Sequence, residues 1–143
     1  MATVLIAELT NIGRQRFADM TVNGRSFIIE QFETGEGGHD PMNPSVALTP
    51  DVSVTALPLL TFGPKAVTSS ALQSIYTAQI DCTLASTEAV GTLSNIGLIA
   101  RINYSPIPAD PLLNTTFLFA LANLPMQNKL AGETRDFNLI INY

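Results

Sequence analysis

The chain has 143 residues, of which 46% are hydrophobic and only 13% are charged. This length suits one domain, and the charged share is about half of the roughly 25% usual in soluble domains. The net charge of −5 comes without a basic stripe, which argues against a nucleic-acid ligand. A chain with so few charges would expose apolar patches as a lone monomer, so we expect lasting contacts with partner subunits.

Residues 1–8 form an apolar N-terminal arm. Val4, Leu5 and Ile6 favour a β-strand, and a terminus is usually loose unless it docks. We expect the arm to add to a sheet, either that of its own chain or that of a neighbour. The arm lacks the features of a signal peptide, and no apolar run reaches the ~20 residues that cross a bilayer. The expected location is therefore the cytoplasm of the producing cell until lysis.

A helix is expected over residues 9–21. Thr10 is a suitable N-cap, and Asn23-Gly24 is a suitable end. The apolar side chains recur near helical spacing and are Leu9, Ile12, Phe17 and Met20.

From residue 25 onward the apolar period changes to two, as in strands with one buried face. Three segments alternate in this way, namely 51–60 (Val52, Val54, Ala56 and Leu60), 76–84 and 137–143. Two more segments, 97–100 with Ile102 and 117–122, are apolar on both faces. They are expected to be central strands or strands that a neighbouring subunit covers.

These elements predict a mainly β fold, an antiparallel β-sandwich or open barrel with one N-terminal α-helix. Residues 1–143 would form one domain, in which the β part spans residues 25–143. Cys82 is the only cysteine, so no disulfide within the chain is possible, and a buried, inert thiol is expected.

No catalytic, cofactor or metal site is predicted. Glu33, Glu36, His39 and Asp40 could together offer an ion an imidazole and three carboxylates. One histidine among irregularly spaced acids in a glycine-rich turn is weak support, so a solvated loop is the preferred interpretation. Residues 35–38 are not followed by the Gly-Lys-Ser/Thr of a phosphate loop, and no nucleophile motif is present. We therefore expect a protein that is not an enzyme.

Four short phrases, in order, resemble the N-terminal, virion-anchoring domain of phage tail fibre and tail-collar proteins. They are Leu9-Thr10-Asn11-Ile12-Gly13, Thr34-Gly35-Glu36-Gly37-Gly38, Ser94-Asn95-Ile96-Gly97-Leu98 and Ala122-Asn123-Leu124-Pro125 with Gly132-Glu133. Each phrase is short, and the ordered set carries the likeness. In that family the closing hairpin often carries an aromatic-Lys-Pro phrase, and a long fibre shaft commonly follows. This sequence has Met126-Gln127-Asn128-Lys129-Leu130 instead, and it ends at Tyr143.

The resemblance implies a structural protein of the virion tail, a baseplate, collar or fibre-adaptor subunit. It would form homotrimers and bind other tail, baseplate or fibre proteins. The hypothesis for the contact residues names Val4, Leu5 and Ile6 of the arm and Phe117, Phe119 and Leu121 of the later strand.

Two alternatives fit the same composition. One is a capsid-decorating head protein. The other is a carbohydrate-binding β-sandwich, which usually stacks sugars on exposed aromatic rings. The chain has no Trp and three Tyr, and the strand pattern places Tyr76 and Tyr143 on apolar, inward sides. That placement weighs against the carbohydrate alternative.

Overall fold

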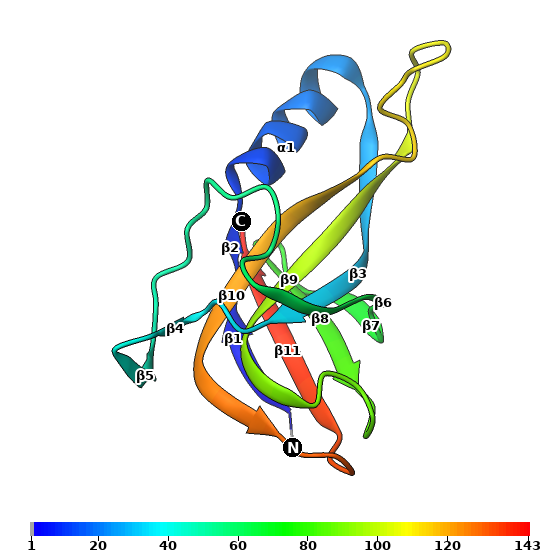
Figure 1. Cartoon of the computed structure of the whole chain (residues 1–143). Coiled ribbons are helices and arrows are strands. Elements are labelled where there is room, and N and C mark those ends of the chain that lie inside the picture. The colour runs from blue at the N-terminus through cyan, green and yellow to red at the C-terminus, as the bar shows by residue number, and fades with distance from the viewer. Residues whose placement is uncertain (1) are drawn as a thin grey trace.

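The chain folds into two main β-sheets, a small two-stranded sheet and one helix in a computed structural model that describes residues 2–143 (Figure 1). The expected mainly β class is confirmed. The elements in chain order are β1 (Thr3–Ile6), β2 (Glu8–Leu9), α1 (Asn11–Asn23), β3 (Ser26–Gly35), β4 (His39–Asp40), β5 (Asn43–Ala47), β6 (Leu60–Ala66), β7 (Ser69–Ser74), β8 (Thr77–Leu84), β9 (Gly91–Tyr104), β10 (Thr116–Lys129) and β11 (Arg135–Asn142).

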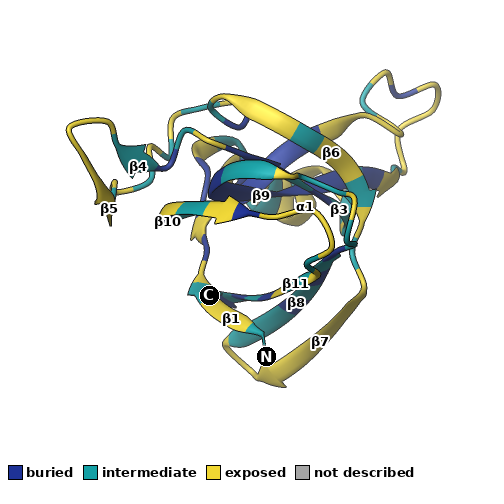
Figure 2. Cartoon of the chain, turned by 60° about the horizontal axis from the view of Figure 1, so that its bottom comes forward, coloured by how far each residue is buried: buried dark blue, intermediate teal, exposed yellow. Residues whose placement is uncertain are grey.

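The two main sheets face each other as the layers of an open sandwich (Figure 2). One sheet has four strands in the order β1-β11-β8-β7, and the other has five in the order β2-β10-β9-β3-β6. Neighbouring strands are antiparallel except β1 and β11, which are parallel. The pair β4-β5 forms a separate hairpin that projects from the side of the sandwich. The two main sheets share no strand and do not close into a barrel, which is consistent with the sandwich among the two expected architectures.

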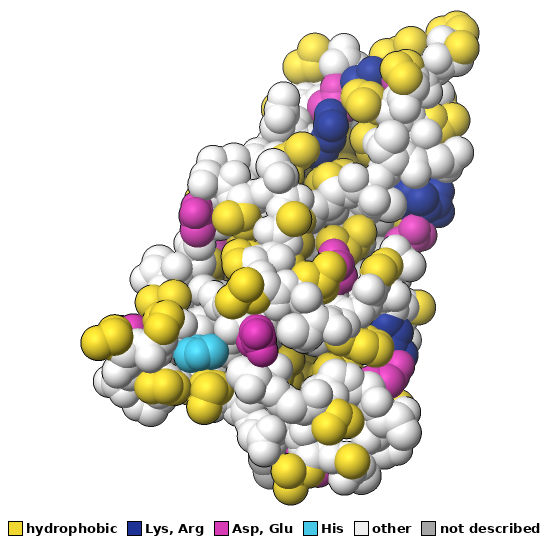
Figure 3. Space-filling view, viewed as in Figure 1, with side chains coloured by type: hydrophobic (Ala, Val, Ile, Leu, Met, Phe, Trp, Pro, Cys, Tyr) yellow, Lys and Arg dark blue, Asp and Glu magenta, His cyan; other side chains and the backbone are white. Residues whose placement is uncertain are grey.

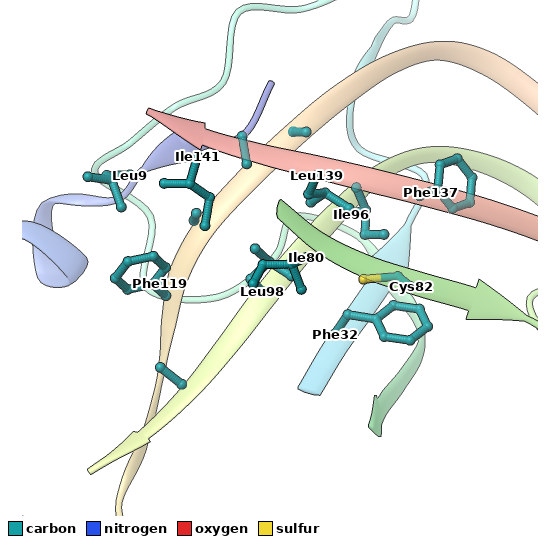
Figure 4. Packing of buried hydrophobic residues seen from close by; sticks show 14 of the residues in the cluster. Leu9, Phe32, Ile80, Cys82, Ile96, Leu98, Phe119, Phe137, Leu139 and Ile141 are labelled. Atoms are coloured by element: carbon teal, nitrogen blue, oxygen red, sulfur yellow. The ribbon is translucent and has the colours of Figure 1, made fainter. Parts of the chain in front are cut away.

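The core lies between the sheets and is built from alternate residues of each strand (Figure 4). In β8 and β11 the predicted alternation is confirmed, because Ile80, Cys82, Phe137, Leu139 and Ile141 are buried while their sequence neighbours are not. Their position fixes the inner face of the four-stranded sheet.

The helix begins and ends close to where the sequence predicts. Thr10 is the N-cap and accepts a hydrogen bond from the Gly13 amide, and Gly24 ends the helix with a left-handed φ of 73°. The helix covers 11–23 rather than 9–21, because Leu9 belongs to β2 and pairs with Ala120 of β10. Within residues 2–143, no helix is both long and apolar enough to cross a membrane.

The apolar segments 97–100 with Ile102 and 117–122 lie in the two inner strands β9 and β10. The chain itself covers both faces of these strands. One face packs in the core. The other face is covered by the buried Leu57. A Cβ atom on Gly97 would lie 3.2 Å from the side chain of Leu57 and 2.8 Å from that of Leu118. Central strands, the first of the two expectations, are therefore observed.

The covering segment corrects one prediction. Residues 51–59 do not form the strand that the alternation of Val52, Val54 and Ala56 suggested. The Asp51 carboxylate instead accepts hydrogen bonds from the backbone amide and hydroxyl of Ser53, which bends the chain. The segment crosses the five-stranded sheet as a strap, held by hydrogen bonds from Asn11 N to Val52 O and from Asn95 Nδ2 to Pro58 O.

Candidate assembly surface

The N-terminal arm adds to a sheet of its own chain. The sequence had left open whether it would join this sheet or that of a neighbouring subunit. Strand β1 pairs in parallel with β11, with Leu5 beside the buried Leu139. Leu5 therefore points inward and packs against the core. Val4 and Ile6 point outward and are 62% and 54% exposed.

Both edges of the four-stranded sheet are free within the described part of the chain, since β1 and β7 are its outermost strands. All six residues of β7 are exposed (Figure 2). Neither edge strand contains a charged residue, whereas β8 contains Asp81 and β11 contains Arg135 and Asp136. Edge strands of isolated proteins usually carry charges, prolines or bulges that block pairing with another chain. Here the charges lie on the inner strands instead, and β7 carries one irregularity, a shift in its register with β8 between Leu72 and Ser74.

Leu72 of β7 faces the interior of the sandwich and yet is 81% exposed. Its partner across the strand pair is Ala78, and the next inward pair is Ser70 with the buried Ile80. Because directly opposed residues of antiparallel strands share a face, Leu72 lies on the core side of the sheet. The five-stranded sheet does not cover that position, so the sandwich is open there.

An apolar groove runs along this open side. It forms because β3 pairs with β6 only from Gln31 onward, which leaves residues 26–29 of β3 without a strand on that side among the described residues. The groove has a volume of about 570 Å³. Its lining comes from α1, β3, β7, β8 and the C-terminal residue and consists of Phe17, Met20, Phe27, Ile28, Ile29, Ser70, Ala71, Leu72, Ala78, Ile80 and Tyr143.

Aromatic rings form one end of the groove and attach the helix to the sandwich. The Phe17 ring lies 5.2 Å from that of Phe27, 5.6 Å from that of Phe119 and 5.4 Å from that of Tyr143, measured between centroids. Edge-to-face contacts of this kind add stability beyond the burial of area. The helix is otherwise lightly packed, because Gly13 is its only buried residue.

An ion-pair network fixes the strand and helix that border the groove. Arg25, just before β3, binds Asp19 of α1 at 2.7 Å and Asp110 of the β9-β10 connection at 2.6 Å. Hydrogen bonds from Arg25, Ser105 and the Leu112 amide hold the pKa of the Asp110 carboxyl well below its usual range. The groove therefore has a rigid rim at this end.

Three of the six predicted contact residues are not available at the surface. Phe117, Phe119 and Leu121 are 8%, 0% and 1% exposed and pack inside their own chain. Their hydrophobic run reflects the position of β10 between β2 and β9 beneath the helix and the strap. This part of the interface hypothesis is wrong for the folded chain, while Val4 and Ile6 remain accessible.

The acidic residues around His39 do not converge. Among residues 2–143, no group of three or more His, Cys, Asp or Glu side chains is placed to hold a metal ion. The His39 ring lies 2.9 Å from the Ser94 hydroxyl through Nδ1. Glu33 lies apart in β3, where burial raises the pKa of its carboxyl.

The surface chemistry bears on two other predictions. On the face drawn in Figure 3, acidic and basic side chains are interspersed rather than gathered into a basic stripe. The inward placement predicted for Tyr76 is wrong, because Tyr76 is 64% exposed. Tyr143 does face the groove, where its ring lies 5.4 Å from that of Phe17, yet it is 51% exposed. Tyr76 lies in the turn before β8, and Tyr143 follows the end of β11. Their placement therefore no longer counts against the carbohydrate alternative.

The phrases that carry the family resemblance are sites of close backbone packing. A Cβ on Gly38 would lie 1.9 Å from the Ser94 carbonyl oxygen and 2.9 Å from Oδ1 of Asn123, so the second, third and fourth phrases meet at Gly38. The Gly38 amide also donates a hydrogen bond to the Ser94 hydroxyl. In the first phrase, a Cβ on Gly13 would lie 2.4 Å from the Phe119 carbonyl oxygen. Gly13 and Gly38 therefore help to hold the framework together.

No family model, curated protein sequence or solved structure matches the chain.

Strand β7 and the groove have no clear signature in the sequence. Residues 69–74 are Ser-Ser-Ala-Leu-Gln-Ser, which shows no alternation and no hydrophobic run. The available signal was the absence of any charge between Lys65 and Asp81. A charge-free stretch that is not hydrophobic enough for a core strand indicates an edge that lacks the usual protection.

Proposed function

We propose that this chain is a structural subunit of a phage tail, a baseplate, collar or fibre-adaptor part that works by binding other chains. It needs no catalytic group and no cofactor for this task. What such a part requires is a rigid framework with uncovered strands that another subunit completes.

The observation that carries the assembly function is the exposure of Leu72 on the inner face of β7. An inward-facing leucine that remains in water leaves the hydrophobic stabilisation of its side chain, about 1.5–3 kcal/mol, unrealised. The groove beside it is largely apolar. A second chain that filled the groove would recover this free energy.

The uncharged sheet edges support the same proposal. Strands with free backbone donors and acceptors template pairing with other chains, and assemblies use this mode for strong association, since backbone hydrogen bonds supply affinity. Val4 and Ile6 of β1 add exposed apolar side chains at the opposite edge.

The tail location rests on the four phrases and their arrangement. Among the glycines, Gly38 and Gly13 of these phrases leave the least room for a Cβ atom. Since such contacts tolerate few substitutions, their residues would remain recognisable in a domain whose surface has diverged.

The location is tested by immunogold electron microscopy with antibodies against the purified chain, applied to particles of a phage that encodes it. Gold on the tail, baseplate or fibre base is the expected result. Gold on the head would replace the proposal with the capsid-decorating alternative. Particles without label, in a preparation where a known tail protein is labelled, would show that the chain is not a virion component.

A further inference from the structure

We propose that β1 of one copy pairs with β7 of a second copy, so that the four-stranded sheet continues from subunit to subunit. This inference rests on the proposed function, because it names a second copy of the chain as the partner of the assembly surface. The contact is head-to-tail, since each copy contributes a different edge.

The absence of charge on both edges favours a second copy of the chain as the partner. The uncharged sequences Thr3-Val4-Leu5-Ile6 and Ser69-Ser70-Ala71-Leu72-Gln73-Ser74 form the two edges of one sheet. If only one edge bound a partner, the other would need its own protection against random pairing. Pairing of the two edges with each other leaves neither of them free.

The strand directions are compatible with this contact. β1 is parallel to β11, β11 is antiparallel to β8, and β8 is antiparallel to β7. β1 and β7 therefore run in the same direction within one copy. A rotation about an axis along the strands preserves that direction and brings β1 of one copy beside β7 of the next in parallel. Repetition of a head-to-tail contact closes into a ring where the rotation angle divides a full turn.

The side chains are compatible on both faces of the joined sheet. Leu5 of β1 and Leu72 of β7 both point to the inner face. Ala71 pairs with Gln79 on the outer face of β7, the same face on which Val4 and Ile6 lie in β1. The joined edges would thus bring Leu5 to the inner face that carries Leu72, and Val4 and Ile6 to the outer face that carries Ala71, among the polar side chains of β7, and would cover part of the groove beside Leu72.

Two variants separate this contact from other modes of association. Leu72→Lys puts a charge on the β7 edge, and Val4→Lys combined with Ile6→Lys puts charges on the β1 edge. All three side chains are more than half exposed, so the variants should keep the fold, which thermal melting by circular dichroism checks. The matched control is Met42→Lys, which charges a 93% exposed residue at the β4-β5 hairpin.

The masses are measured by light scattering after size exclusion. We expect a discrete oligomer for the wild type and for Met42→Lys, and monomers for both edge variants. The decisive sample is an equimolar mixture of the two edge variants. One variant retains an intact β7 and the other an intact β1, so the mixture should form a dimer through a single contact.

Three results would overturn the inference. The wild type could be a monomer at all concentrations at which it is soluble. Only the β7 variant could lose the oligomer, as a symmetric β7-β7 contact predicts. The mixture of variants could also remain monomeric. Each of these results would leave the tail location to be decided by microscopy. If instead the chain forms the β1-β7 oligomer but antibodies against it label no particle, the proposed function alone would be contradicted.

Discussion

The Thr10 hydroxyl donates a 2.6 Å hydrogen bond to the backbone carbonyl of Leu118, a residue 108 positions later in the sequence. The same oxygen accepts a hydrogen bond from the Gly13 amide at the start of the helix. Thr10 is fully buried. One side chain thus caps the helix and attaches it to β10, which explains why a polar residue occupies this interior position.

Replacement of Thr10 by Val should destabilise the protein by about 2–3 kcal/mol, because it removes the N-cap and leaves a buried carbonyl without its donor. Thr10→Ser should cost less than half as much, since it keeps the hydroxyl. Guanidinium unfolding curves give the free energy of unfolding for both. Equal losses in the two variants would show that the methyl group, not the hydroxyl, matters at this position.

Gly13→Ala should destabilise the protein, although the same change in an ordinary helix stabilises it by about 1 kcal/mol. The reason is the 2.4 Å approach of the new Cβ to the Phe119 carbonyl oxygen, which forces the helix away from β10. We expect a loss of roughly 2 kcal/mol or more, in the range of overpacked interiors. The control is Thr21→Ala at an exposed helix position, which should be neutral or slightly stabilising by urea denaturation. An increase in stability for Gly13→Ala would contradict the observed contact.

The Arg25-Asp110 pair should make stability depend on acid. The pKa of Asp110 is lowered in the folded state, so its contribution is present above the unfolded-state pKa of about 3.9 and is lost as the pH falls through the folded value. Asp110→Asn should therefore be destabilised at pH 7, and its melting temperature should fall less steeply than that of the wild type below about pH 4. Asp136→Asn, at an exposed position, should retain the acid slope of the wild type. Parallel slopes for Asp110→Asn and the wild type would argue against the ion pair.

Cys82 should be inert in the folded protein. Burial beneath the five-stranded sheet raises the pKa of its thiol to about 12, and the reactive species is the thiolate. Ellman's reagent at pH 8 should therefore titrate no thiol in the native state and one thiol per chain in guanidinium. Rapid labelling of the native protein would indicate that the core opens at β8.

The helix, β8 and β11 could be predicted from the sequence because local signals decide them. Thr10 and Gly24 bound the helix through hydrogen bonding and a left-handed turn. In β8 and β11 one face packs in the core, so Ile80 and Leu139 alternate with polar neighbours. The sandwich follows from such one-sided strands.

The strap and the open side could not be predicted in the same way. Val52 and Val54 alternate as strand residues do, yet the turn at Asp51 prevents them from pairing with a neighbouring strand. Phe117 and Phe119 look the same in sequence whether a second subunit or the chain's own helix covers them. Leu72 has no hydrophobic neighbour within β7 other than Ala71, so its importance depends on a gap between sheets, which only the three-dimensional arrangement reveals.

Hydrogen exchange of the backbone amides of Ser69–Ser74 tests the central claim most directly, because it observes the β7 edge itself. The comparison is between the wild type and the variant that carries Val4→Lys and Ile6→Lys, in which the substitutions lie at the opposite edge of the same sheet. If β1 of another copy covers β7, several β7 amides should exchange slowly in the wild type and much faster in the variant, while β8 and β11 stay protected in both. Equal and rapid exchange of the β7 amides in both proteins would mean that the edge faces water and that a second copy does not complete the sheet.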